Sequence, residues 1–105
     1  MKSLRRVRRR HGRCYELAFR AVIEAPETQD LKLVHGSAVL NPAAGERINH
    51  AWVLLPGSRV YDPVLDQCFT ERGFAERHKA VVSRVYTRME AAQTLLENNH
   101  YGPWT

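Results

Sequence analysis

The chain has 105 residues, 44% of them hydrophobic and 26% charged, a composition typical of one small globular domain rather than a disordered or membrane-spanning chain. Its net charge of +5 comes from the N-terminus, because seven of the sixteen Lys and Arg residues lie in residues 1–13. The rest of the chain has nine basic and eleven acidic residues and is therefore slightly acidic. No secretion signal and no membrane-spanning apolar run is visible, so we expect a cytoplasmic protein with no membrane partner, whose two cysteines are free thiols.

Residues 1–12 form a basic arm, whose charge comes mainly from Arg5, Arg6, Arg8, Arg9 and Arg10. Such a segment can bind the phosphates of nucleic acid or the carboxylates of an acidic partner. No base-reading motif follows it, so any binding to nucleic acid should be independent of base sequence. The alternative is a solvated terminus that binds nothing.

The first predicted helix begins at Cys14 and ends near Ala25, because Pro26 cannot continue it. Its apolar residues recur at helical spacing along one face: Cys14, Leu17, Ala18, Ala21, Val22 and Ala25. Residues 31–40 then predict a strand, and Gly36 is the place where a bulge fits best.

The rest of the chain predicts, in order, a strong strand, a turn, a returning strand, a short helix or irregular segment, another strand and a final helix: residues 48–55, 56–58, 59–62, 69–79, 80–86 and 87–98. The final helix opens with a capping box at Thr87–Glu90. The short loops between strands indicate a mainly antiparallel sheet with helices on one or both faces. We therefore expect a single α+β domain over residues 13–105.

Cys14 stands where the first helix begins. Unpaired N–H groups and the helix dipole favour a thiolate there, and the thiolate is the nucleophilic form of cysteine. Arg13 and its neighbours act in the same direction. The same N–H groups can stabilise a negatively charged oxygen on a substrate. The alternative is that Cys14 is simply a small buried residue on the inner face of the helix.

His50 and Asp62 are predicted on strands joined by a hairpin, with Trp52 on the same face as His50. A five-residue loop would place His50 and Asp62 directly opposite, and a three-residue loop would make them diagonal neighbours with Cβ atoms roughly 7 Å apart. A two-residue loop would separate them onto opposite faces, but Pro56 cannot adopt the positive φ that it needs. The other interpretations are a core histidine and a turn aspartate before Pro63.

The order Cys14, His50, Asp62, in the segments GRCYELA, INHAWVLL and RVYDP, resembles the papain-like and transglutaminase-like superfamily of cysteine enzymes over roughly residues 11–65. HAWV and VYDP are similar to the histidine and aspartate strands of transglutaminase-like and leader-peptide-cleaving members. GRCYEL is similar to the cysteine motif of arylamine acyltransferases, which are much longer. The resemblance implies a papain-like core with Cys14 as nucleophile, His50 as base and Asp62 as the group that orients it.

The resemblance departs at the oxyanion hole. Papain has a glutamine shortly before its cysteine, whereas this chain has arginines followed by His11 and Gly12. His11 or a backbone N–H could take that role. His35 would line the site if its strand neighbours that of His50, and Trp52 would line it from the same strand, although both also suit an ordinary core.

Ligand types for a metal are present without the usual Cys-x-x-Cys spacing, in Cys14, His35, His50 and Cys68. We therefore expect no metal or other cofactor.

These residues together predict a small cysteine-dependent hydrolase, such as a peptidase or amidase, or an acyltransferase. The Cys14 thiolate would attack a protein, peptide or other amide or ester substrate, His50 would transfer the proton, and Asp62 would hold the imidazole. Water would resolve the acyl-enzyme in a hydrolase, which we favour, and an amine in a transglutaminase-like transferase. The second hypothesis is a non-catalytic protein on the same scaffold that binds nucleic acid or an acidic partner through its arm.

Overall fold

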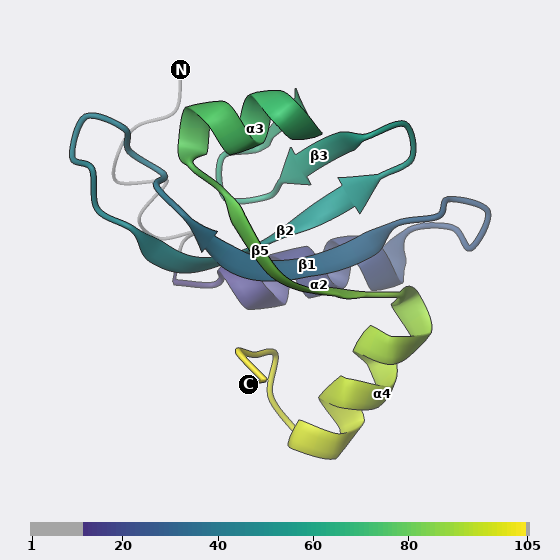
Figure 1. Cartoon of the computed structure of the whole chain (residues 1–105). Helices are drawn as coiled ribbons and strands as arrows, with labels where there is room; N and C mark the ends of the chain where they lie inside the picture. Colours follow the sequence, from purple (N-terminus) through teal and green to yellow (C-terminus); the bar gives the residue numbers. More distant parts are fainter. Residues whose placement is uncertain (1–11, 105) are drawn as a thin grey trace.

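The five strands of the computed structural model form one antiparallel sheet in the order β4-β3-β2-β1-β5 (Figure 1). The structure describes residues 12–104, so the predictions for the basic arm and for His11 lie outside it. The elements in chain order are α2 (Cys14–Glu24), β1 (Lys32–Ala38), β2 (Ile48–Leu55), β3 (Arg59–Asp62), β4 (Gln67–Thr70), α3 (Glu71–His78), β5 (Val81–Tyr86) and α4 (Arg88–Asn98). The predicted α+β class is confirmed.

Helices cover both faces of the sheet: α2 and α4 lie on one side and α3 on the other (Figure 1). Of the predicted apolar stripe, helix α2 buries Cys14, Ala18 and Val22, and the remaining three residues are half-buried. Ala18 and Val22 pack in one cluster with Ala51 and Val53 of β2, together with Phe19, which the predicted stripe did not include. On the opposite face α3 contributes Phe74 to a smaller cluster, whose other buried members are Val34, Trp52 and Val60. Strand β2 therefore lies between two hydrophobic layers, which accounts for its strong sequence pattern.

The hairpin between β2 and β3 has a three-residue loop, because Leu55 pairs with Arg59. Gly57 and Ser58 adopt left-handed backbone conformations in this turn, with φ of 79° and 56°. Glycine takes such a conformation without steric cost. Of the two loop lengths that the sequence left open, the structure has the shorter one, and this makes His50 and Asp62 diagonal neighbours.

Helix α3 lies within residues 69–79, where the sequence predicted a short helix or an irregular segment. The helix is present as Glu71–His78, capped by Thr70, whose hydroxyl accepts a hydrogen bond from the Gly73 N–H. The edge strand Gln67–Thr70 is a fifth strand that the sequence did not predict. Three of its four residues are exposed, so it lacks the alternation of buried and exposed positions that reveals a strand.

The bulge expected at Gly36 is confirmed, since the β1–β5 register shifts between His35 and Gly36. A Cβ atom at Gly36 would overlap the carbonyl oxygen of Val81 and lie 2.8 Å from the Trp52 ring, so this position admits only glycine without a shift of the strands. Within residues 12–104, no helix is long and apolar enough to cross a bilayer.

Candidate functional site

Three side chains predicted to act together are close in the structure. Cys14 is the first residue of α2 and only 3% exposed, while His50 in β2 and Asp62 at the end of β3 are fully buried. The imidazole Nε2 of His50 lies 2.7 Å from Oδ2 of Asp62. Cys14 also interacts with His50, because hydrogen bonding and Coulombic attraction from the thiol are among the causes that raise the pKa of His50. The three side chains, from α2, β2 and β3, therefore form one buried cluster.

His50 lies close to both α2 and β3 because it stands where the β2–β3 pairing ends. Alternation along β2 starts the His50 side chain on the Trp52 face, whereas α2 covers the Ala51 face. The ladder pairs only Val53–Leu55 with β3, so His50 lies beyond its paired part. The N-terminus of α2 and the last residue of β3 both meet the imidazole at this open end.

The Asp62 carboxylate is held by the backbone as well as by His50. Its Oδ1 accepts hydrogen bonds from the N–H groups of Val64 and Leu65, at 2.9 and 3.2 Å. Its Oδ2 faces His50. The turn role and the orienting role were alternatives for Asp62 in the sequence, and the geometry assigns one oxygen to each. The hydrogen bonds of the turn therefore hold the carboxylate in position independently of its contact with His50.

The charge state of His50 follows from opposing effects. Burial alone lowers its pKa, because an imidazolium is poorly solvated inside the protein. Hydrogen bonds to Asp62 and Cys14, together with their Coulombic attraction, outweigh burial and raise the pKa of His50 to about 9. An imidazolium between a carboxylate and a thiol is thus the favoured form near neutral pH.

The start of α2 leaves backbone donors near the thiol. The side chain of Arg13, the N-cap residue, makes no capping hydrogen bond. Its guanidinium instead forks onto the carboxylate of Glu16, with two N–O distances of 3.1 Å. The first N–H groups of a helix lack partners within the helix itself. They are the structure's candidates to bind a negatively charged oxygen beside Cys14.

The other residues proposed to line the site behave differently from one another. The Trp52 ring lies 5.9 Å from the His50 ring and packs against Phe74, so it forms the wall behind the imidazole. His35 lies on the opposite face of the sheet, with its ring packed against Tyr15 and Tyr86. It does not contact the Cys–His–Asp cluster in any interaction that the structure records, although its strand does neighbour β2.

Cys68 is exposed on the edge strand β4, far in the topology from β1 and α2. In the described part of the chain, no group of three or more His, Cys, Asp or Glu side chains is arranged to hold a metal ion. The four residues with suitable ligand chemistry therefore do not converge on one point.

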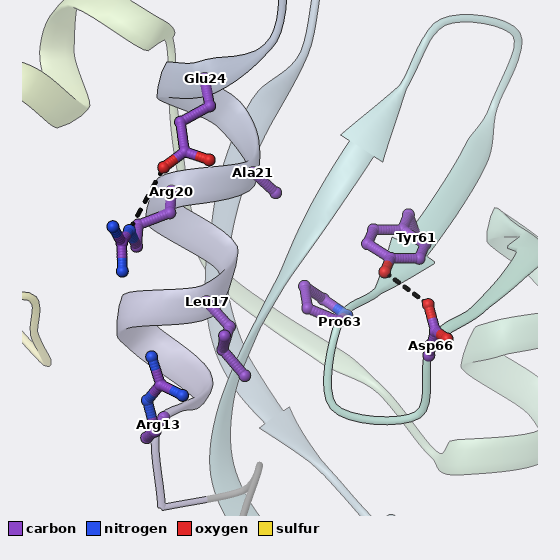
Figure 2. Close-up of a pocket in the computed structure, with 8 residues that line it drawn as sticks. All are labelled: Arg13, Leu17, Arg20, Ala21, Glu24, Tyr61, Pro63 and Asp66. Atoms are coloured by element: carbon purple, nitrogen blue, oxygen red, sulfur yellow. Dashed lines mark hydrogen bonds and ion pairs between the residues drawn. The ribbon is translucent and has the colours of Figure 1, made fainter.

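Two cavities are lined by the chain neighbours of Cys14. A groove of about 560 Å³ runs between α2 and the turn after β3 (Figure 2), and Arg13, Leu17 and Pro63 are among the residues that line it. Across the turn, the Tyr61 hydroxyl donates to Asp66 at 2.7 Å, as Figure 2 also shows. A smaller pocket of about 200 Å³ includes Tyr15 in its wall. The residues immediately before and after Cys14 thus line different cavities.

The sequence analysis did not predict the smaller pocket, although two of its lining residues adjoin predicted site residues in the sequence. Tyr15 and Asn49 are the chain neighbours of Cys14 and His50, and both line it. Its other wall comes from β5, whose register against β1 depends on a bulge. No sequence pattern fixes that register.

Comparison with known proteins adds no family: no family model matches the chain, and no curated protein or solved structure is significantly similar to it.

Proposed function

We propose that this protein is a small cysteine-dependent hydrolase or acyltransferase that works through Cys14, His50 and Asp62. The observation that carries the proposal is a buried cluster in which His50 lies 2.7 Å from the Asp62 carboxylate and interacts with the Cys14 thiol. A nucleophile beside a base that a third group orients is the arrangement required for covalent acyl transfer. The proposal agrees with the papain-like and transglutaminase-like resemblance of the sequence.

The proposed reaction begins with the Cys14 thiolate, whose proton has passed to His50. The sulfur attacks a carbonyl carbon, and the carbonyl electron pair moves to oxygen, near the first N–H groups of α2. The tetrahedral intermediate collapses, the bond to the leaving amine or alkoxide breaks, and the imidazolium of His50 donates its proton to that group. A thioester of Cys14 remains.

His50, now neutral, then removes a proton from water or from an amine, which attacks the thioester and restores the thiol. Water makes the protein a peptidase, amidase or esterase, and an amine makes it a transferase; hydrolysis needs no second binding site and is the simpler of the two. Asp62 acts throughout by keeping a proton on Nε2, which directs Nδ1 towards the sulfur.

The first experiment measures the rate of iodoacetamide alkylation of Cys14 at pH 6 in a Cys68→Ser background. An unactivated thiol has a pKa of about 8.5 and is only about 0.3% thiolate at this pH. We expect Cys14 to react at least tenfold faster than Cys68, measured in a Cys14→Ala background. The rate should fall by at least tenfold in His50→Gln.

His78→Gln is the matched control, because His78 is also buried but its Nδ1 lies 2.9 Å from the Val39 carbonyl oxygen on the α3 side of the sheet. The control should alkylate as the parent does. Incubation with p-nitrophenyl acetate should also leave an acetyl group on Cys14, detected by peptide mass spectrometry. Slow alkylation that His50→Gln leaves unchanged, with no acetyl adduct, would refute the catalytic proposal.

A further inference from the structure

The smaller cavity, which Tyr15 and Asn49 help to line, has a polar wall. It lies over the α2 and α4 face of the sheet, and its polar wall is made by His35, Asn49, Ser83 and Arg84. Its volume of about 200 Å³ is below the 300 Å³ at which sites for drug-sized ligands begin, so it suits a single short side chain or end group.

Strand register brings these polar groups together. His35 pairs with Arg84 of β5 on one side and with Ala51 of β2 on the other, so His35 and Arg84 share a face. Asn49 pairs with Ser37 two positions along the same face. The bulge after His35 leaves Ser83 as the extra residue of β5. Three adjacent strands thus present polar side chains to one small cavity.

His35 contributes an unused hydrogen-bonding atom. Its side chain is 6% exposed, and its buried Nε2 has no hydrogen-bond partner within residues 12–104. Burial lowers the pKa of His35 to about 4, so the ring is neutral near pH 7 and carries one N–H. A buried polar atom without a partner is costly unless a ligand or water completes it.

Arg84 contributes the charge. Its guanidinium carbon lies 5.0 Å from the centre of the Tyr86 ring, which holds the cation at the pocket. No residue recorded in the pocket wall is acidic, and no ion pair of Arg84 occurs within the described chain. Glu90, whose pKa is lowered in part by Arg84, is hydrogen-bonded to Thr87 in the capping box of α4. The positive charge is therefore available to a ligand.

We propose that this pocket binds a carboxylate group of the substrate, of the size of an aspartyl or glutamyl side chain, through Arg84 and His35. The inference rests on the proposed function, because Tyr15 and Asn49, which line the pocket, are the chain neighbours of Cys14 and His50. A substrate whose carbonyl reaches the thiol then places an acidic group against Arg84. The protein would prefer acyl groups that carry a nearby carboxylate.

The test compares two thiol-directed probes, the chloromethyl ketones of acetyl-glutamate and acetyl-glutamine, on the full chain in a Cys68→Ser background. We expect Cys14 to be labelled at least tenfold faster by the glutamate probe. Arg84→Gln should bring the ratio close to one, since it removes the charge from an exposed position without disturbing the core. Arg77→Gln is the matched control, because Arg77 is an exposed arginine of α3 on the opposite face, and it should keep the ratio.

Equal labelling by both probes would overturn the carboxylate pocket and leave the proposed function standing. If neither probe labels Cys14, the proposed function fails, and a glutarate titration followed by amide NMR shifts decides the pocket separately. Shifts at Ser83 and Arg84 that Arg84→Gln abolishes would support a carboxylate site without catalysis. An absence of such shifts would overturn the site as well.

Discussion

Asp62→Asn separates the two roles of the Asp62 carboxylate. The amide oxygen can still accept the N–H groups of Val64 and Leu65, so the turn after β3 should persist. The amide NH₂ group then faces Nε2 of His50, where the carboxylate Oδ2 stood at 2.7 Å. A donor in that place disfavours a proton on Nε2, and it removes the negative charge that stabilises the imidazolium.

The size of the effect follows from the pKa of His50, which the fold raises from 6.5 to about 9. A raised histidine pKa stabilises the folded state fully below the unfolded value, and the contribution is lost as pH rises through the folded value. At 1.36 kcal/mol per pKa unit, the full contribution is about 3 kcal/mol, and about 2 kcal/mol of it disappears between pH 7 and pH 9. Asp62→Asn should remove most of this pH dependence.

Urea denaturation at pH 7 and pH 9, followed by tryptophan fluorescence, measures this difference as a change in the free energy of unfolding. The parent should lose about 2 kcal/mol more than Asp62→Asn over this interval. Groups that titrate in this interval without interacting with His50 are present in both proteins and cancel in the comparison. Equal losses in the two proteins would show that Asp62 does not hold His50 in its charged form.

Three further predictions concern the activity of Asp62→Asn and the stability of variants at two supporting positions, Gly36 and Arg88. Asp62→Asn should lower any acyl-transfer rate by roughly 10³–10⁴-fold, measured by steady-state kinetics, because the imidazole would present its proton rather than its lone pair to the thiol. Gly36→Ala should lower the free energy of unfolding by about 1–3 kcal/mol in urea titrations, because its methyl group meets the Val81 carbonyl. Arg88→Met should lower the free energy of unfolding by about 1–3 kcal/mol in the same assay, because the Arg88 guanidinium donates hydrogen bonds to two backbone carbonyls at the end of α2. Arg72→Met is the control at an exposed ion pair, and it should lower the free energy of unfolding by less than about 1 kcal/mol.

The contact between His50 and Asp62 could be predicted because it depends on local chemistry. Pro56 excludes a two-residue turn, and both remaining loop lengths keep the two side chains on one face. The choice between those lengths depended on which residue after Pro56 could adopt a left-handed conformation, and both Gly57 and Ser58 do so. Serine seldom adopts a left-handed conformation, so the sequence does not predict one at Ser58.

The approach of Cys14 to His50 could be only partly predicted. The helical pattern showed that α2 has a buried face, but which face of the sheet receives it depends on packing between distant segments. The fifth strand escaped prediction for a related reason. Gln67–Thr70 is ordered by pairing with β3 rather than by burial of its own side chains, and pairing leaves no periodic pattern in an exposed strand.

Asp62 links the stability of the fold to the readiness of the candidate site. Its Oδ1 closes the turn after β3, and the same carboxylate holds the His50 imidazole through Oδ2. The side chain is fully buried, so neither hydrogen bond competes with water. When backbone groups hold a carboxylate in position beforehand, the proposed reaction needs no further free energy to orient it. A single carboxylate thus closes the turn after β3 and also positions the His50 imidazole, which is the base of the proposed reaction.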